Sequence, residues 1–479
     1  MKYETVIGLE THTELATASK LWCGCSTAFG TPPNTQVCPV CLGMPGVLPV
    51  LNKKALEYSL TALLALGCKT NLFSTFDRKN YYYPDLPKNY QISQNHLNLG
   101  VDGYVDIKTD GETKRITINN VHLEEEAGKL IHPEDSEADY SLVDFNRAGV
   151  PLLEIVTNPD MRTLEEVEQF MLALRNILLY NEVSDCKMQE GSLRFEASIS
   201  LRPAGRERLG NRVEMKNLNS MKSVLKALEY EIGRQTEVLE SGKEVDMETR
   251  LWDEAGGYTA RMRSKEEAQD YRYFPEPDLA PMVIEESWLD ELRSTLPELP
   301  LVRRNRFVEE YSLSDYDAGV LTEEKAVADY FEDCTALLSS PKSLCNWITN
   351  DVLRELKERK TGIKDFGVRP EGLVSLVKMA EDGVISLPVA REVFVRMVDT
   401  GRDAAELVKE KGLLQISDKG ELEQLVLKVL GENPAAVSDY HKGKKASLGF
   451  LVGQIMRQSK GKANPKVVNN LLAEKLKAG

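Results

Sequence analysis

Four cysteines lie close together near the start of the 479-residue sequence, as the pairs Cys23/Cys25 and Cys38/Cys41. Four thiolates in two close pairs can bind one metal ion, and zinc favours such a closed tetrahedral site made only of sulfur. Eight cysteines in so long a chain do not indicate a disulfide framework. We therefore expect a structural zinc site in the loop 21–45. Four reduced cysteines without a metal are the alternative.

Two acidic segments, each with a histidine, indicate a different metal ion. The first strand-like segment ends with Glu10, His12 and Glu14, which strand alternation places on one face. The second is the run 122–126, a histidine and a leucine followed by three glutamates. If both line one cleft, carboxylates about 4 Å apart repel by about 4 kcal/mol at an effective dielectric of about 20. A divalent cation such as Mg²⁺ would offset that repulsion. A solvated acidic edge is the alternative.

Two further strand-like segments bring acidic and basic side chains together. Arg194, Glu196 and Ser198 share one face of the first segment, and Glu214 and Lys216 share one face of the second. Mixed charges of this kind suit the binding of phosphate beside a metal. Ordinary ion pairs between neighbouring strands are the alternative.

Several common catalytic motifs are absent from the sequence. It contains no G-x-x-x-x-G-K-[ST] phosphate loop and no G-x-G-x-x-G fingerprint, so a nucleotide would be held by metal-bridging carboxylates and basic side chains. It also contains no G-x-S-x-G elbow or Ser-Lys pairing. We therefore do not expect this chain to release ammonia from glutamine itself.

Length and local patterns predict an α+β region followed by helices. A chain of this length should form two or three domains. Strand patterns with Gly/Pro-rich loops fill the first 290 or so residues, and helical patterns follow, with the change near Pro297 and Pro300 and a second boundary near 400–403. Thr163 and Glu166 form a capping box for a helix to about Tyr180. A last helix is predicted with Asn464 as its cap and Pro465 at its first position.

The charge is distributed unevenly along the chain. The whole chain carries a formal charge of −15, but from residue 441 to the end nine lysines and arginines face one glutamate, a balance of 9 − 1 = +8. A basic end on an acidic protein indicates a module that binds a polyanion, with a solvated lysine-rich face as the alternative. No apolar stretch is long enough to span a membrane and no targeting peptide precedes the first strand, so we expect a cytoplasmic protein.

Longer motifs, taken in order, resemble one family. They include the segments 4–10 (ETVIGLE), 76–81 (FDRKNY), 83–88 (YPDLPK), 140–144 (YSLVD), 216–220 (KNLNS) and 270–275 (DYRYFP), with 449–454 (GFLVGQ) and 460–465 (KGKANP) near the end. These segments are similar to those of the B subunits of tRNA-dependent amidotransferases. The resemblance is colinear from about residue 3 to 479.

This resemblance implies a fold and a reaction. The implied fold is a glutamine-synthetase-like α+β catalytic cradle at 1–293, an all-α helical domain at 294–405 and a small helical tail at 406–479 that binds tRNA. The implied reaction is phosphorylation by ATP of the side-chain carboxylate of Glu-tRNA(Gln), Asp-tRNA(Asn) or both, followed by amidation with ammonia. The implied partners are mischarged tRNA, a glutaminase A subunit that supplies ammonia and a small C subunit, with no membrane. A stand-alone ATP-dependent carboxylate-amine ligase and a non-catalytic RNA-binding scaffold are the alternatives.

The resemblance also implies roles for single residues. Glu10, His12 and Glu125 match positions around the magnesium ion, with Glu124 beside them. Strand alternation puts Glu124 and Glu126 on one face, so Glu125 needs a bulge or turn to reach the ion, and both Glu124 and Glu125 stay candidates. The catalytic candidates are Glu10, His12, Lys79, Lys88, Glu124, Glu125, Arg194, Glu196 and Glu214, and Lys88 is expected where ammonia arrives. The candidates for ATP binding are Lys79, Arg194 and Lys216, and those for tRNA binding are Lys442, Lys444, Lys445, Arg457, Lys460, Lys462 and Lys466.

The sequence departs from the family pattern at two places. The family usually has Arg-Cys-Asp-Ala-Asn-Val-Ser where this chain has Arg194-Phe195-Glu196-Ala197-Ser198-Ile199-Ser200, so the carboxylate of Glu196 extends one methylene farther. Asn89 stands where glycine is common. The four cysteines occur in only part of the family, which agrees with a structural role for the zinc.

Overall fold

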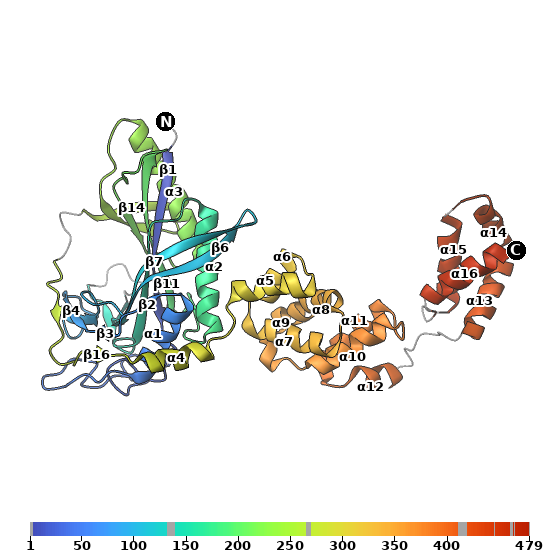
Figure 1. Cartoon of the computed structure of the whole chain (residues 1–479), viewed down its shortest axis with the longest axis horizontal. Coiled ribbons are helices and arrows are strands. Elements are labelled where there is room, and N and C mark those ends of the chain that lie inside the picture. The colour runs from blue at the N-terminus through green and yellow to red at the C-terminus, as the bar shows by residue number, and fades with distance from the viewer. Residues whose placement is uncertain are drawn as a thin grey trace. The chain divides into compact units, whose positions relative to one another are not determined.

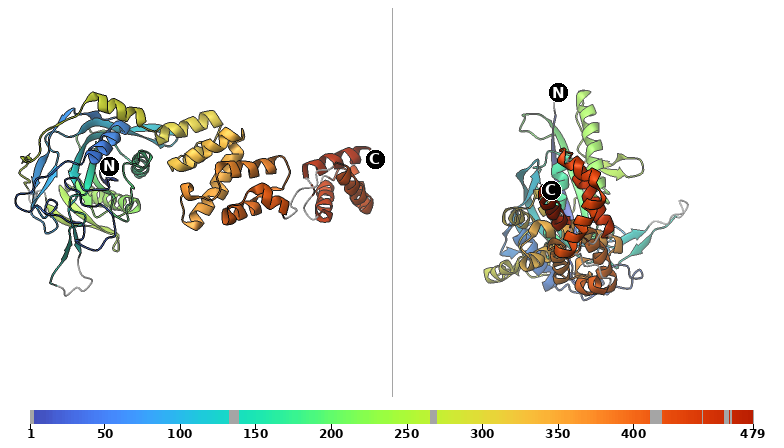
Figure 2. Two further views of the ribbon diagram at one scale, coloured as in Figure 1. Left: turned by 90° about the horizontal axis from the view of Figure 1, so that it is seen from below. Right: turned by 90° about the vertical axis from the view of Figure 1, so that its right-hand side faces the viewer.

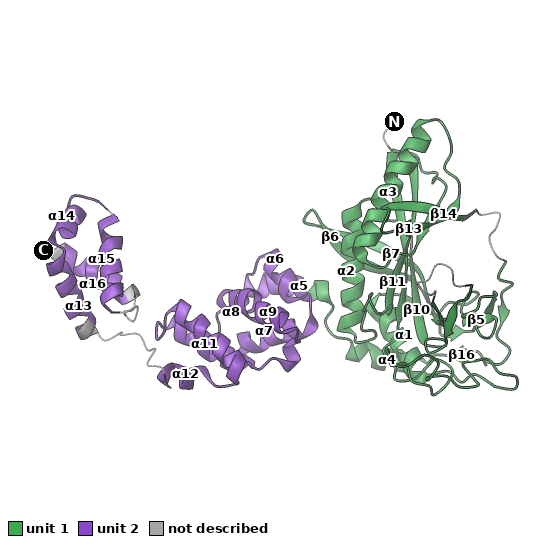
Figure 3. Ribbon diagram, turned by 180° about the vertical axis from the view of Figure 1, so that it is seen from behind, with its two compact units in different colours: residues 1–302 green, residues 303–479 purple. Residues whose placement is uncertain are grey.

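The computed structural model describes residues 3–131, 139–264, 270–410, 419–444, 446–459, 463 and 465–478. The chain forms two compact units, residues 1–302 and 303–479, which Figure 3 shows in separate colours. Unit 1 is built around β-sheets with helices, and the described part of unit 2 is helical. A mixed α/β region followed by helices, as the sequence predicts, is therefore confirmed.

Unit 1 is built on a nine-stranded sheet in the order β14-β13-β12-β11-β1-β10-β7-β6-β2. Its strand pairs are antiparallel except for β12 and β13, which are parallel. The strands are β1 Tyr3–Glu14, β2 Lys69–Thr70, β6 Gly100–Thr109, β7 Glu112–Glu125, β10 Pro151–Thr157, β11 Leu193–Pro203, β12 Val213–Lys216, β13 Glu248–Asp253 and β14 Tyr258–Ser264. All four strand-like segments singled out in the sequence lie in this sheet.

Three helices pack on one face of the sheet: α1 Lys53–Ala65, α2 Leu164–Tyr180 and α3 Met221–Glu240 (Figures 1 and 2). Alternate residues of β1, such as Ile7 and Leu9, share one buried core with Val167 and Phe170 of α2. The hydroxyl of Thr163 accepts a hydrogen bond from the backbone N–H of Glu166 and so caps α2. The cap predicted at Thr163 is therefore confirmed, but the Glu166 carboxylate accepts a hydrogen bond from the backbone N–H of Arg162 at 2.6 Å rather than completing the capping box at Thr163.

Smaller sheets border the large one. Strands β15 Phe274–Pro275, β4 Asp77–Asn80 and β5 Tyr90–Ser93 form a three-stranded sheet beside the end of β7. The amide of Gln91 donates to the backbone oxygen of Glu125 over 2.7 Å, and the amide oxygen of Gln94 accepts from the backbone N–H of Leu123 over 2.8 Å. These bonds fix β5 against β7. Two two-stranded sheets complete the unit: β3 Phe73–Ser74 with β16 Met282–Val283, and β8 Lys129–Ile131 with β9 Leu142–Asp144.

Unit 1 continues past the domain boundary predicted at 293/294. Helix α4 Glu286–Thr295 crosses that point, and Leu289 and Leu292 of α4 are buried in the core of the sheet unit. Leu296 and Leu299, beyond the helix, pack against the same core. The first compact unit of the chain ends at Val302.

Unit 2 contains two separate apolar cores. The first core joins α5 Pro300–Tyr311, α6 Asp315–Leu321, α7 Lys325–Leu337, α8 Pro341–Trp347, a π-helix Ile348–Val352, α9 Leu353–Arg359, a 3₁₀-helix Ile363–Asp365, α10 Pro370–Glu381, α11 Leu387–Thr400 and α12 Ala404–Glu410. Ala404, Leu407 and Val408 of α12 are buried in this first core, so α12 crosses the boundary predicted at 405/406. Among the helices of the described residues, none is both long and apolar enough to cross a bilayer.

The second core of unit 2 joins the last four helices. They are α13 Lys419–Glu432, α14 Pro434–His441, α15 Ala446–Gln458 and α16 Pro465–Ala478. Val468, Leu471, Leu472 and Leu476 form the buried side of α16, and Pro465 is its first residue, as the sequence predicts. Its expected cap, Asn464, lies outside the described residues.

A buried charged network joins α3 to β13 and β14. Glu231 is fully buried and accepts two hydrogen bonds from Arg234, at 2.8 and 2.9 Å. The hydroxyl of Thr259 also donates to Glu231, and Arg250 lies 3.1 Å from it. Burial alone would raise the pKa of Glu231, but hydrogen bonds from Arg234, Thr259 and Gln235 hold it below the usual value. Glu231 is therefore ionised and paired.

We predict that Glu231→Gln lowers the free energy of unfolding of the sheet unit by about 3 kcal/mol at pH 7, because it leaves buried arginines without their carboxylate. A carboxyl with a lowered pKa stabilises the fold above its unfolded pKa of about 4.3, and this stabilisation is lost as the pH falls through the folded pKa. Denaturant titrations from pH 7 downwards should thus show a steeper acid loss in the unsubstituted chain than in the variant. Glu229→Gln, on the exposed side of the same helix, is the control; equal acid slopes for both chains would contradict the assignment.

Candidate active site

A stripe of charged side chains crosses five neighbouring strands on the sheet face that the helices leave open. Strand pairing places His12 of β1 opposite Glu154 of β10 and opposite Arg194 of β11. Glu154 in turn lies opposite His122 of β7, and Glu10 lies opposite Glu196. These side chains share one face because strand residues two positions apart point the same way. The structure therefore brings together the four segments that the sequence singled out.

Glu154 lies at the centre of this stripe, between two histidines. Its Oε2 is 3.3 Å from His12 Nε2 and 3.0 Å from His122 Nε2. His12 Nε2 is also 3.5 Å from a carboxylate oxygen of Glu10 and 4.0 Å from one of Glu124. Three carboxylates thus surround one imidazole.

The electrostatics of the cluster follow from this crowding. Burial alone would lower the pKa of His12, but its hydrogen bond to Glu154 and the charges of Glu154, Glu124 and Glu10 raise it to about 9. Burial and the charge of Glu154 raise the pKa of Glu10. Glu154 is buried, yet His122 and His12 lower its pKa well below the usual value. In this arrangement the histidines carry the positive charge that the carboxylates require.

Glu125 does not join the cluster. β7 is regularly paired with β10 through Glu125, so no bulge turns its side chain toward Glu10 and His12. One Glu125 oxygen instead accepts a hydrogen bond from the backbone N–H of Ile92 at 2.8 Å and pairs with Lys88. Glu124, bonded to Ser93 at 3.0 Å, occupies the cluster position for which both glutamates were candidates.

On strands β11 and β12, acidic and basic side chains of the stripe form ion pairs. Lys216 Nζ lies 2.5 Å from Glu196 and 3.1 Å from Glu214. Arg194 pairs with Glu126, which follows β7. The longer side chain of Glu196 therefore meets an ammonium group in this structure. Arg194 and Glu196 also line a pocket of about 710 Å³, together with Glu14, Arg147, Asn217 and Asn219 among others.

The two candidate lysines lie in different surroundings. Lys79 on β4 faces the acidic cluster: burial alone would lower its pKa, but the charge of Glu124 raises it. Its Nζ lies 5.1 Å from the ring centre of Tyr271. Lys88 is buried with Glu125 and lies 5.1 Å from the ring centre of Tyr90. Asn89, next in the chain, has a φ of 61°, a left-handed conformation that explains the family's preference for glycine there.

The cluster fits a divalent cation. One ligand atom each from Glu10, His12 and Glu154 lies within 4.8 Å of the others. Two carboxylates and an imidazole on a rigid sheet would leave other positions of the ion open to water or phosphate oxygens. His122, Glu124 and Glu154 form a second such group that shares Glu154.

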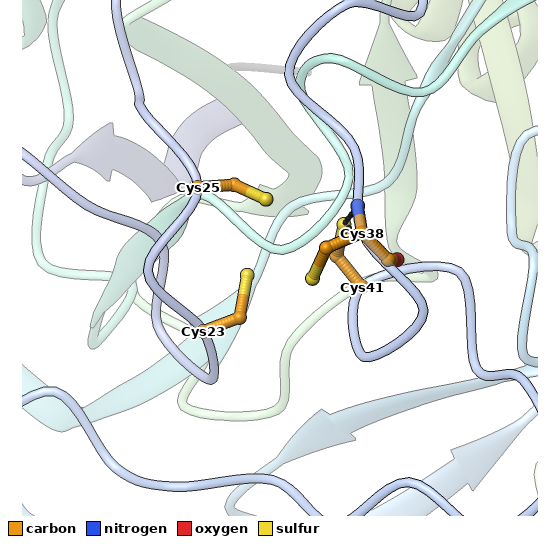
Figure 4. Close-up of side chains that lie close together, drawn as sticks. All are labelled: Cys23, Cys25, Cys38 and Cys41. Carbon is orange, nitrogen blue, oxygen red and sulfur yellow. Dashed lines mark hydrogen bonds between the residues drawn. The ribbon is translucent and has the colours of Figure 1, made fainter.

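The four cysteines fit a zinc ion. Their sulfur atoms all lie within 4.8 Å of one another, and none forms a disulfide. Figure 4 shows the thiols of Cys23 and Cys25 turned toward those of Cys38 and Cys41. A tetrahedral ion with metal–sulfur distances of about 2.3 Å would bring sulfurs to about 3.8 Å from one another. A hydrogen bond from Cys23 to Cys41 lowers the pKa of Cys41 and raises that of Cys23, so these two sulfurs share one proton.

The basic residues of the tail are only partly described. Lys442, Lys444 and Arg457 are exposed on the last four-helix group. Lys444 lies 3.1 Å from Asp439. Lys445, Lys460 and Lys462 lie outside the described residues, and the position of the Lys466 side chain is not described.

Sequence reasoning missed Glu154. The segment Pro151–Thr157 is almost wholly apolar and buried, and Glu154 is its only charged residue. A single carboxylate in a buried strand is costly unless it is paired or binds a metal, and that pattern was the available signal. Its partners could not be identified, because the register between β10, β1 and β7 depends on pairing over long sequence separations.

Comparisons with known proteins show the family to which the chain belongs. Residues 5–290 match the model of the GatB/GatE catalytic domain, and residues 329–476 match the model of the GatB domain. The B subunit of the aspartyl/glutamyl-tRNA(Asn/Gln) amidotransferase of Caldanaerobacter subterraneus subsp. tengcongensis is 56% identical over 476 residues, covering 99% of this chain and 100% of that protein. The proteins of the same name from Brevibacillus brevis and Moorella thermoacetica are each 52% identical and cover 99% of this chain, which itself covers 99% and 100% of them.

The family models together span both units, and these relatives match from end to end. The chain therefore belongs to the family of amidotransferase B subunits.

We predict that Glu154→Gln weakens divalent cation binding about 10-fold or more, because it removes the charge shared by two ligand groups while keeping the side-chain shape. Titration calorimetry with Mg²⁺ or Mn²⁺ measures the affinity. Glu165→Gln, on the exposed side of α2, is the control and should bind the cation normally. Unchanged affinity in the Glu154 variant would show that the cluster is a network of ion pairs and not a metal site.

Proposed function

We propose that this chain is the kinase and transamidase subunit of a tRNA-dependent amidotransferase. It uses ATP to phosphorylate the side-chain carboxylate of Glu-tRNA(Gln), Asp-tRNA(Asn) or both, and ammonia then displaces the phosphate. The observation that carries the proposal is the charged stripe, in which Glu10, His12 and Glu154 meet within reach of one divalent ion. The names of the relatives, which describe amidotransferase B subunits acting with these tRNAs, support it.

The chemistry needs charge neutralisation more than covalent assistance. Phosphoryl transfer spreads negative charge over the transferred group, and metal ions and basic side chains stabilise that charge. Glu10, His12 and Glu154 would hold Mg²⁺, which would neutralise negative charge on phosphate oxygens. Lys79 and Lys216 flank the cluster from opposite sides, where their ammonium groups can bind phosphate oxygens. The sheet and its charged face form the glutamine-synthetase-like cradle of this proposal.

The pocket beside the stripe suits the acceptor substrate. It measures about 710 Å³ and lies directly beside the stripe, because Glu196 belongs to both. Lys129, Arg147 and Arg194 give its lining basic groups for the carboxylate and phosphates of an aminoacyl-tRNA end. Asn146, Asn217 and Asn219 add neutral groups for hydrogen bonds.

Ammonia is supplied by a partner in this proposal. The relatives are named as the B component of an amidotransferase, so the chain is expected to work with other subunits, among them a glutaminase A subunit and a small C subunit. The zinc ion held by the four cysteines has a structural role here, because four protein ligands leave no open position for a reaction.

We predict that the reconstituted complex with the glutaminase A and C subunits accumulates a phosphorylated aminoacyl-tRNA when ATP is present and ammonia is withheld. Glu10→Gln and His12→Ala should slow transfer of the γ-phosphate about 100-fold or more, because each removes a metal ligand. Radiolabelled γ-phosphate measures the transfer, with Glu165→Gln as the control. Full amidation by both variants would favour the RNA-binding scaffold.

The tail is the proposed tRNA-binding module. Its basic groups Lys442 and Arg457 are exposed, and the four helices have an apolar core of their own. Because α12 is buried in the neighbouring core, a truncation that spares that core must end after Glu410, not at the boundary predicted from the sequence.

We predict that truncation after Glu410 strongly weakens binding of aminoacyl-tRNA but leaves ATP binding intact, since the charged stripe lies wholly in unit 1. Lys442→Ala and Arg457→Ala should each reduce the salt dependence of tRNA affinity, with a slope change of about 0.7–0.9 for each lost phosphate contact. Filter binding at several salt concentrations measures both effects. Lys428→Ala, an exposed lysine of α13 near Glu432, is the control. Amidation of a free carboxylate substrate that the truncation leaves unchanged would favour the stand-alone ligase.

A further inference from the structure

The cysteine loop lies directly against the buried Lys88–Glu125 pair. Gly43, two residues after Cys41, has a φ of 63° and lies so close to Lys88 that an added Cβ would be 2.4 Å from Lys88 Cγ. The same Cβ would be 3.3 Å from Lys88 Cα. The turn that ends the second cysteine pair therefore sets how close the Lys88 side chain lies to the sheet.

Gly149 links the loop to the glutamate of the pair. Gly149 lies between Cys41, Lys20 and Glu125: an added Cβ there would be 3.6 Å from Cys41 Cβ, 3.6 Å from Lys20 Cδ and 3.9 Å from Glu125 Oε2. The backbone N–H of Leu21 donates to the Gly149 oxygen over 2.8 Å. The cysteine loop therefore lies against Lys88 directly, and Gly149 lies between the loop and Glu125.

The pair itself is held in one geometry. The Lys88 side chain is 8% exposed and the Glu125 side chain 4%. The backbone N–H of Ile92 donates to the same Glu125 oxygen that Lys88 contacts. Lys20 is fully buried beside Gly149, and its ammonium donates to the Phe145 oxygen over 3.2 Å. Few other positions are open to the Lys88 ammonium in these surroundings.

We propose that the cysteine loop positions Lys88 against Glu125, with Gly43 as the positioning residue. The metal that the four cysteines bind then acts on the reaction indirectly, by fixing the turn on which Lys88 rests. The position of Lys88 can be tested without any assumption about the activity; only its consequence for amidation rests on the proposed function.

Gly43→Ala tests the contact, and Gly46→Ala is a matched control. Both glycines have a positive φ, 63° and 86°, so both substitutions add the same kind of backbone strain. An added Cβ at Gly46 meets nothing within 4 Å, whereas one at Gly43 meets Lys88. A difference between the two variants thus reports the contact with Lys88.

The measurement is the rate at which each lysine of the zinc-loaded full-length chain reacts with an acylating reagent, followed by mass spectrometry. Lys88 should react slowly in the unsubstituted chain and in Gly46→Ala, and at least several-fold faster in Gly43→Ala, relative to the half-exposed Lys54. Removal of the metal with a chelator should expose Lys88 in the same way. Equal Lys88 rates in the two glycine variants, or no change on chelation, would overturn the proposal.

A double-mutant cycle keeps the proposal testable if Gly43→Ala folds poorly. Lys88→Ala removes the Cγ atom that the new methyl group would meet, so Gly43→Ala should lower the melting temperature less in the Lys88→Ala background than in the unsubstituted chain. Equal losses in both backgrounds would overturn the proposed contact.

Amidation by the complete complex separates this inference from the proposed function. If Gly43→Ala exposes Lys88 and slows amidation while Gly46→Ala does neither, both are supported. If Lys88 becomes exposed and amidation is unchanged, the positioning role is confirmed and the expectation that Lys88 acts where ammonia arrives is contradicted.

Discussion

The structure of the catalytic unit depends on the repulsion among carboxylates crowded onto one sheet face. Glu10, Glu124 and Glu154 all lie within 4.0 Å of His12. Uncompensated negative charges at such separations would cost several kcal/mol at an effective dielectric of about 20. Protonated His12 and His122 offset that cost here. A divalent cation would neutralise the same carboxylates, and its binding would release protons from the histidines. Affinity for a cation is therefore a consequence of how these strands are paired.

A face of this kind needs a strongly stabilised opposite face. The helices α1, α2 and α3 bury the alternate residues of the same strands in one continuous core. Glu154 sits in β10 between Leu153 and Ile155, so burial of its neighbours holds the carboxylate in the cluster. The apolar face thus provides the free energy that keeps the charged face rigid, and a rigid face is what metal and phosphate binding need.

The sequence could predict what alternation and capping decide locally. The shared face of Glu10, His12 and Glu14, the helix after Thr163 and the clustering of the cysteines all follow from short-range patterns. The partners of Glu154 and the pairing of Arg194 with Glu126 could not be found, because they arise from strand order and register. The predicted boundaries at 293/294 and 405/406 differ from the structure for a similar reason. The apolar cores that bury α4 and α12 decide to which part of the chain each helix belongs, and contacts with distant residues cannot be read from the local sequence.

The end of β7 links the two sides of the sheet. Glu124 and Glu125 are consecutive, so alternation turns them to opposite sides: Glu124 faces the charged stripe with His12, and Glu125 faces Lys88 and the cysteine loop. β5 binds both carboxylates, Glu124 through the hydroxyl of Ser93 and Glu125 through the backbone N–H of Ile92. Two adjacent residues therefore connect the proposed site of phosphate transfer with the lysine that the cysteine loop supports. Residues 27–31 of the metal loop also line the pocket beside the stripe, so this connection is a second way in which the loop can matter to the reaction.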